Sequence, residues 1–89
     1  MEAILHPSAE KYLNRLDSID NARINKALDG LEEDPPKGDI IPLSGEPGRF
    51  RLTVGKYRLL FRIKKDFILV THIDPRGQVY NKKNKGKKR

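Results

Sequence analysis

The feature that most constrains the fold is a run of alternating polar and apolar residues from Arg49 to Arg62. Apolar side chains take every second position in both halves of the run: Phe50, Leu52 and Val54, then Tyr57, Leu59 and Phe61. A period of two is typical of half-buried β-strands. Gly55-Lys56 separates the halves, and glycine supplies the positive φ that a short hairpin turn needs. The run therefore predicts a β-hairpin with one apolar face.

The polar positions of this predicted hairpin hold four arginines: Arg49, Arg51, Arg58 and Arg62. If the apolar face is buried, all four side chains emerge together on the opposite face. Like charges on one sheet face repel one another unless an anion neutralises them. The planar guanidinium group matches two phosphate oxygens and stays charged. The hairpin thus predicts a face for an anionic partner, and the alternative is that the arginines are simply solvated.

The net charge of +7 is unevenly distributed along the 89 residues. Residues 1–48 carry five basic and ten acidic side chains, or −5, and residues 49–81 carry eight against two, or +6. Residues 82–89 add six basic side chains, including Lys82 and Lys83, and no acid, or +6. Such a polarised chain suits a nucleic-acid partner approached from one side. The tail is expected to be disordered without a partner and to contact phosphate groups, or else merely to aid solubility.

Several classes of protein are disfavoured by what the sequence lacks. It contains no cysteine, so we expect neither a disulfide framework nor a thiolate metal site. The lack of cysteine also favours a reducing compartment. His6 and His72 lie far apart without ligand spacing, so we expect no metal and no cofactor. The chain has no long apolar run and no secretory pattern at its start. A cytoplasmic protein is therefore expected.

The first half of the chain predicts one strand and two helices. Residues 1–5 are a short apolar strand, and Ser8 is the expected N-cap of a helix of about nine residues. Ser18 or Asp20 is the expected cap of a second helix, which ends before Pro35. Both helices show apolar residues at helical spacing: Ala9, Tyr12, Leu13 and Leu16, then Ile24, Ala27, Leu28 and Leu31. Their short connection predicts an antiparallel helical hairpin.

The rest of the chain predicts a loop and three strands. Residues 35–48 are rich in proline and glycine and are expected to form a loop, pinned to the core by Ile40, Ile41 and Leu43. The arginine hairpin follows, and the apolar run from Phe67 predicts a strand buried on both faces. The fold class is therefore α+β, in the order β-α-α-β-β-β, with the helices on one face of a three-stranded antiparallel meander. Residues 1–81 form one domain, followed by the basic tail 82–89.

The stretch from Gly48 to Phe61 resembles the central signature of the RelE/ParE toxin superfamily. That signature is a basic strand, a short glycine-containing turn, and a Tyr-Arg step followed by apolar residues, here Tyr57-Arg58. The order of elements agrees up to Tyr80, and so does the closing Arg76-x-x-Val79-Tyr80. The resemblance implies a toxin with a cognate antitoxin as partner. In the RelE branch the toxin cuts messenger RNA in the ribosomal A site without a metal, using the ribose 2′-OH; the ParE branch inhibits DNA gyrase.

The resemblance also implies roles for particular residues. Arg49 and Arg51 match basic strand residues that face the RNA backbone, and Arg58 matches an arginine that supports the scissile phosphate. Tyr80 matches a tyrosine implicated in proton transfer or base stacking, and Arg76 matches a basic residue before it. Further contacts with RNA are expected from three residues: Arg62, Lys82 and Lys83. The chain departs from many relatives in having Asp74-Pro75-Arg76 where they have His-Arg.

The arginines meet the need for charge stabilisation, but the general base is harder to identify. Tyrosine has an unperturbed pKa of about 10, so Tyr80 acts as a base only if neighbouring arginines lower its pKa. His72 and Asp74 are the other candidates. The structural alternatives are that Tyr57 belongs to the core, that Arg62 pairs with Asp66 or Asp74, and that Tyr80 only covers the sheet edge.

The sequence therefore favours a metal-independent, ribosome-dependent mRNA endoribonuclease in which Arg58, Arg51, Arg76 and Tyr80 form the catalytic site. Its expected partners are an antitoxin, the ribosome and messenger RNA. Two alternatives stay open: a gyrase inhibitor without ribonuclease activity, and a non-catalytic member of the fold that binds RNA or a protein partner.

Overall fold

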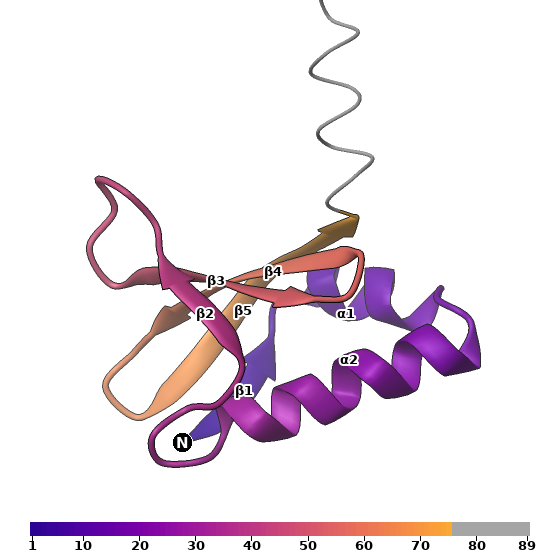
Figure 1. Ribbon diagram of the computed structural model, residues 1–89, viewed down its shortest axis with the longest axis horizontal. Coiled ribbons are helices and arrows are strands. Elements are labelled where there is room, and N and C mark those ends of the chain that lie inside the picture. Colours follow the sequence, from indigo (N-terminus) through magenta and orange to yellow (C-terminus); the bar gives the residue numbers. More distant parts are fainter. Residues whose placement is uncertain (76–89) are drawn as a thin grey trace, which may run out of the picture.

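The computed structural model of the chain describes residues 1–75 and shows one five-stranded sheet with two helices (Figure 1). The elements in chain order are β1 (Glu2–Leu5), α1 (Pro7–Asn14), α2 (Ser18–Leu31), β2 (Asp39–Pro42), β3 (Arg49–Val54), β4 (Tyr57–Ile63) and β5 (Phe67–Pro75).

The strands lie in the order β1-β5-β4-β3-β2. β3, β4 and β5 form the predicted antiparallel meander, and the N-terminal strand β1 pairs with β5 in parallel. A parallel pair needs a crossover connection. Here the connection from β1 to β5 runs through α1, α2, β2, β3 and β4. The predicted α+β class is confirmed, and the sheet as a whole is mixed rather than purely antiparallel.

The prediction of an uninterrupted loop over residues 35–48 is wrong, because it contains β2. This strand pairs antiparallel with β3, and Ile40 lies opposite Leu52. The pairing continues past the end of β2, where the N–H of Leu43 donates to the carbonyl of Arg49 over 2.9 Å. Gly38 has a φ of +137° just before the strand, and a Cβ added to it would lie 2.7 Å from Cδ1 of Leu52. Glycine therefore allows the chain to enter the sheet close to the core.

The outer edges of the sheet expose few backbone donors. In an antiparallel pair, alternate residues turn their N–H groups away from the partner strand, and in β2 these are Ile40 and Pro42. The N–H of Ile40 donates to the carbonyl of Gly38 over 3.1 Å, and proline has no N–H. At the opposite edge, the N–H of Ala3 in β1 donates to Oε2 of Glu32 over 2.7 Å.

The observed caps of both helices lie one to three residues before the predicted caps. His6 caps α1, since its Nδ1 accepts from the N–H of Ser8 over 3.1 Å and Pro7 takes the first helical position. Asp17 caps α2 by accepting from the N–H of Asp20 over 2.8 Å. The expected caps Ser8, Ser18 and Asp20 instead lie inside the first turns. The second helix contains all four apolar residues of the predicted spacing, whereas the first ends at Asn14 and leaves Leu16 outside.

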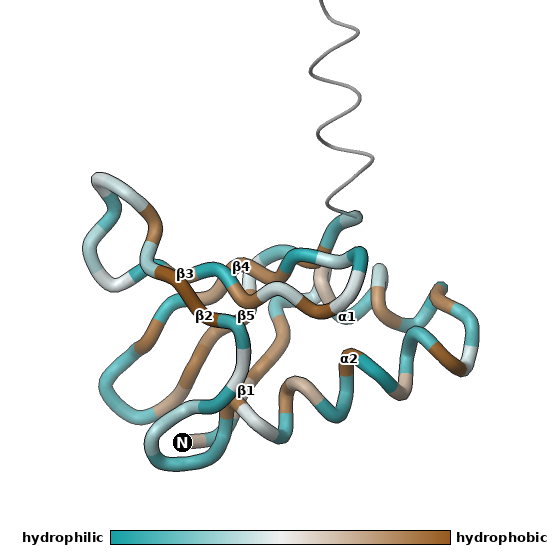
Figure 2. Tube along the Cα trace, viewed as in Figure 1, coloured by the Kyte–Doolittle hydropathy of each residue, from teal (hydrophilic) through white to brown (hydrophobic). Residues whose placement is uncertain are grey.

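The core lies between the two helices and one face of the sheet (Figure 1). Its buried residues come from both helices and from the three central strands: Ala9, Leu13, Ile24, Leu31, Leu52, Val54, Tyr57, Leu59, Phe61, Ile68, Val70 and Ile73. Figure 2 shows how apolar and polar residues alternate along the strands. Phe67 and Leu69 are half-buried and Ile68 and Val70 are buried, so the expected burial of β5 on both faces is only partial.

The predicted arginine hairpin is confirmed in register and turn. Phe50 lies opposite Phe61 with the rings stacked at 5.5 Å between centroids, and Val54 lies opposite Tyr57. Gly55 has a φ of +58°, as the short turn requires. In the described part of the chain, no helix is long and apolar enough to span a membrane.

Candidate functional site

The four arginines of the hairpin lie on the sheet face that the helices leave uncovered. Arg49 stands directly opposite Arg62, and Arg58 stands opposite Thr53. Arg51 lies between these rows, opposite Leu60. Because the intervening residues Leu52, Leu59 and Phe61 are buried beneath the helices, the arginines project to the other side. We call the surface made by Arg49, Arg51, Arg58 and Arg62 the arginine face.

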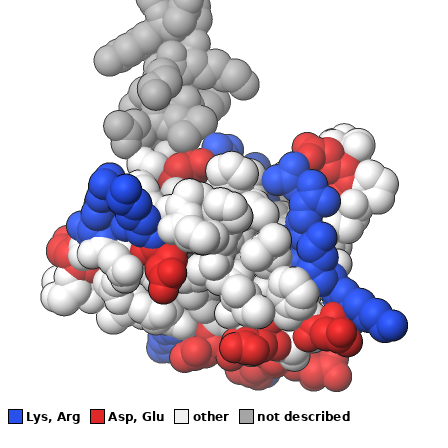
Figure 3. Space-filling view, turned by 180° about the vertical axis from the view of Figure 1, so that it is seen from behind, with Lys and Arg blue, Asp and Glu red and all other residues white. Residues whose placement is uncertain are grey.

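The charges around this surface are segregated. In Figure 3 basic side chains form a stripe along one side of the molecule and a second group on the opposite side, with a broad uncharged surface between them and many acidic side chains at the lower edge. The uncharged residues that the sheet register places beside the arginines include Leu60, which is half-buried, and Ile41, which is 41% exposed. The surface therefore offers both cationic and apolar contacts.

Two of the four arginines are held by carboxylates. Nε of Arg58 donates to Oδ1 of Asp74 over 3.3 Å, and the two residues are opposite one another in β4 and β5. Nη1 of Arg49 lies 2.6 Å from Oε1 of Glu46. Asp74 was a candidate general base and an expected partner of Arg62; its carboxylate is instead bound to Arg58. Among residues 1–75, Arg62 forms no ion pair.

Arg51 is the arginine of this face that is half-buried and lacks a carboxylate. Its Nε is buried and has no hydrogen-bond partner among the described residues, and the same is true of Nε of Arg49. A buried donor without an acceptor costs free energy. An anion over this part of the face would bind the guanidinium group of Arg51 without competing with a carboxylate of residues 1–75.

His72 joins the same face from β5. It lies opposite Leu60, which in turn lies opposite Arg51, so the three residues form one row across the sheet. A register shift at Thr71 sets this row, and the Thr71 hydroxyl donates to the carbonyl of Leu60 over 3.3 Å. Nδ1 of His72 lies 3.0 Å from Oγ1 of Thr71, and the imidazole is exposed. His72 is therefore the imidazole on the arginine face, separated from Arg51 by strand β4.

Tyr57 belongs to the core, as predicted, and not to the arginine face. It is 5% exposed, and its hydroxyl donates to Oδ2 of Asp20 in α2 over 2.6 Å. This hydrogen bond, with burial as a second cause, raises the pKa of Tyr57 to about 12. The ring of Tyr12 packs edge-on against it, with centroids 6.4 Å apart. Burial, followed by the charges of Asp74 and Asp20, raises the pKa of Tyr12 as well.

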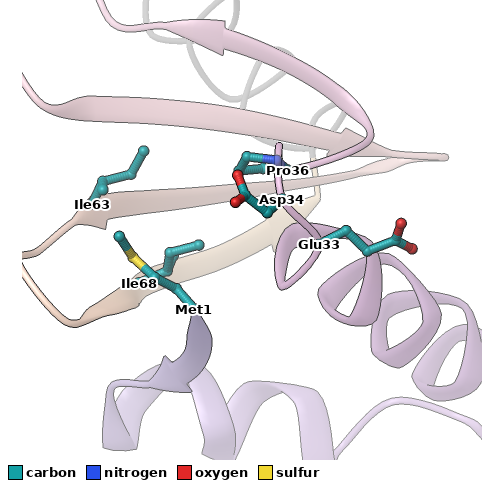
Figure 4. Close-up of a pocket in the computed structure, with 6 residues that line it drawn as sticks. All are labelled: Met1, Glu33, Asp34, Pro36, Ile63 and Ile68. Atoms are coloured by element: carbon teal, nitrogen blue, oxygen red, sulfur yellow. The ribbon is translucent and has the colours of Figure 1, made fainter.

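A pocket of about 230 Å³ lies on the helical side of the sheet, away from the arginine face (Figure 4). It is lined by Met1, Glu33, Asp34, Pro36, Ile63 and Ile68. The two carboxylates would repel a phosphate group, so the pocket is not part of an anion-binding site. Within residues 1–75, no three or more His, Asp or Glu side chains converge as a metal site would require. The predicted site residues Arg76, Tyr80, Lys82 and Lys83 lie outside the described residues.

The sequence and structure comparisons both find proteins of toxin–antitoxin systems. A model of the family described as ParE toxin of type II toxin-antitoxin system, parDE, matches residues 3–80. No curated protein matches the sequence.

Three solved antitoxin–toxin complexes contain chains with a similar fold. The archaeal RelE–RelB complex of Pyrococcus horikoshii gives a TM-score of 0.73 at 26% identity, covering 86% of this chain and 96% of that one. The RelBE2 complex of Mycobacterium tuberculosis gives 0.69 at 26% identity, covering 83% and 95%. The RelB–RelE complex of Methanococcus jannaschii gives 0.72 at 20% identity, covering 89% and 96%, which shows a shared fold.

Proposed function

We propose that this chain, which belongs to the family of ParE toxins of type II toxin–antitoxin systems, arrests growth by cutting messenger RNA on the ribosome. The observation that carries this proposal is the arginine face, which no helix covers and on which Arg51 lacks an anionic partner among residues 1–75. The similarity to chains of RelE–RelB complexes at 26% identity supports the same branch.

The arginine face suits phosphate chemistry without a metal. Cleavage by attack of the ribose 2′-OH builds negative charge on the phosphate oxygens, and guanidinium groups stabilise that charge. Arg51 and Arg58 sit in adjacent strands and project to the same side. Asp74 binds Arg58 through Nε alone, which leaves the terminal nitrogens of the guanidinium for a phosphate. In the proposed mechanism these two arginines hold the scissile phosphate, with Arg49 and Arg76 assisting.

Proton transfer needs a base for the 2′-OH and an acid for the leaving oxygen. We assign these roles to His72 and Tyr80. His72 shares a row with Arg51 and is exposed on the arginine face. Tyr80 is assigned from the family resemblance, since it lies outside the described residues. Asp74 acts through Arg58, which it positions, rather than as the base.

A cognate antitoxin would control the same surface. The three similar chains were solved as complexes with RelB antitoxins. An acidic, amphipathic segment fits the arginine face, with carboxylates over Arg51 and Arg62 and apolar side chains over Leu60 and Ile41. Such a segment excludes RNA by occupying its site. We expect the pair to work in the cytoplasm, where ribosomes and messages are found.

Gyrase inhibition is the second candidate. Two observations favour it: the matching family is the ParE family, and Arg58 is already paired with an acid. An inhibitor needs only a binding surface and no general base.

Primer-extension mapping of cuts on a translated message separates these functions. The wild-type chain is expected to produce new cuts, and Arg51→Ala and Arg58→Ala are each expected to reduce them about 10²–10³-fold. Lys26→Ala is the matched control, because it removes one exposed positive charge from α2 and should leave the cuts intact. Absence of cuts from the wild type, or undiminished cuts from Arg58→Ala, would refute the ribonuclease. Cleaved DNA together with intact message would establish gyrase as the target.

A further inference from the structure

The turn between β4 and β5 carries basic side chains that continue the arginine face. The backbone N–H of Lys64 donates to the carbonyl of Phe67 over 2.8 Å, which closes the turn. Lys64 directly follows Ile63, the last residue of β4, and its N–H bond to Phe67 continues the pairing of β4 with β5, so it extends the alternation that places Arg62 on the arginine face. Two residues of extended chain separate their Cα atoms by on the order of 7 Å. The turn is thus a fixed extension of the sheet surface.

These residues differ from Arg49 and Arg58 in how they are paired. Arg49 and Arg58 are bound to Glu46 and Asp74. By contrast, three basic residues at the turn are exposed and form no ion pair among residues 1–75: Arg62, Lys64 and Lys65. Asp66 is the one acid in the turn itself, against two lysines. An incoming phosphate therefore finds free cations here without first displacing a carboxylate.

The two groups of charges form one continuous track. Arg62 lies directly opposite Arg49, so it joins the turn to the four-arginine surface. A single bound phosphate needs only one cluster of cations, whereas a polynucleotide backbone presents phosphates at regular intervals along a track.

We infer that Arg62, Lys64 and Lys65 form a second phosphate site, which holds the RNA backbone beyond the scissile phosphate. This inference rests on the proposed function for the identity of the ligand. The turn would bind and orient the RNA backbone. Proton transfer would stay with His72 and Tyr80, to which the proposed function assigns it. Its effect should appear in RNA affinity and in the salt dependence of that affinity.

Fluorescence anisotropy with a labelled single-stranded RNA of 2′-O-methyl nucleotides tests the site, because this RNA binds but cannot be cut. Lys64→Ala/Lys65→Ala is compared with Lys11→Ala/Lys26→Ala, which removes two exposed lysines from the helices. Each lost phosphate contact flattens the plot of log Kobs against log [NaCl] by about 0.7 for a single strand. The turn variant should therefore lose about 1.4 in slope and at least tenfold in affinity, and the helix variant should keep the wild-type slope.

Equal slopes and equal affinities for the two double variants would overturn the second site, as would a wild-type chain that does not bind the RNA. Binding and cutting are measured separately, so the two proposals fail differently. A wild-type chain that binds with the expected slope but cuts no message refutes the ribonuclease and keeps the phosphate site. A chain that cuts message while the turn variant binds like the helix variant refutes the site alone.

Discussion

Arg58 and Asp74 face each other across β4 and β5, with Nε of the arginine 3.3 Å from Oδ1 of the aspartate. Both side chains are partly exposed, at 28% and 30%. A pair with this exposure contributes little to stability, typically about 0–1 kcal/mol. In the proposed function, its consequence is that Arg58, which would hold the scissile phosphate, is oriented and partly neutralised before RNA binds.

Replacing Asp74 should therefore strengthen RNA binding. In Asp74→Asn the side chain keeps its shape and loses the charge that opposes a phosphate on Arg58. We expect affinity for the uncleavable RNA to rise by up to about tenfold, corresponding to about 1.4 kcal/mol. Asp29→Asn on α2 is the control for net charge. Equal affinities for the two variants, measured by anisotropy at one salt concentration, would show that Asp74 does not oppose binding.

The hydrogen bond from Tyr57 to Asp20 should matter for stability and not for function. It joins β4 to α2, and Tyr57→Phe removes it while leaving the ring in place. Hydrogen bonds to charged groups contribute about 1.5–3 kcal/mol. We expect the free energy of unfolding in urea to fall by about 1–2 kcal/mol, with message cleavage unchanged. Tyr12→Phe, whose hydroxyl has no partner among residues 1–75, should be nearly neutral. A loss of cleavage in folded Tyr57→Phe would contradict the assignment of Tyr57 to the core.

The same hydrogen bond predicts how stability changes in alkaline solution. The pKa of Tyr57 is raised from 10.0 to about 12 in the folded chain, so the neutral phenol is favoured by folding. Its contribution is fully present below pH 10 and is lost as the pH rises to about 12. The difference in unfolding free energy between wild type and Tyr57→Phe should shrink over this range, and a constant difference would refute the linkage.

Gly38 should be far less replaceable than Gly45. Both have positive φ values, +137° and +74°, but only Gly38 places an added Cβ against the core, 2.7 Å from Cδ1 of Leu52. Gly45→Ala incurs backbone strain alone, about 1–2 kcal/mol. Gly38→Ala adds a clash with the buried Leu52 and should lower the free energy of unfolding by at least about 1 kcal/mol more. Equal urea midpoints for the two variants would show that the backbone at the start of β2, or the Leu52 side chain, moves easily enough to accommodate the added Cβ.

The central part of the fold could be predicted because its signals are local. The alternation from Phe50 to Phe61 defines which face of the hairpin is buried, and Gly55 marks the turn. The apolar spacing along the helices similarly identifies Leu13, Ile24 and Leu31 as core. In each case the period of the secondary structure is written into consecutive residues.

The features that were missed depend on residues distant in the sequence. β2 is only four residues long and contains a proline, so the strand is defined by pairing with β3 and not by its own composition. The Arg58–Asp74 pair depends on the register between β4 and β5, which shifts by one residue at Thr71. No pattern within β4 alone could have favoured Arg58 over Arg62 as the partner of Asp74. The caps His6 and Asp17 were displaced from the expected residues because several polar residues compete near each helix start.

The arrangement of backbone donors at the two outer strands limits how another chain can attach. Strand addition is held by a ladder in which both chains donate and accept. At β2 an added strand would find carbonyls only, since Ile40 donates to Gly38 and Pro42 has no N–H. At β1 it would first have to displace Glu32 from Ala3. An inhibitory protein would therefore bind the side chains on the face of the sheet rather than add a strand to its edge. For the same reason, two copies of the chain would gain few hydrogen bonds by pairing their edge strands.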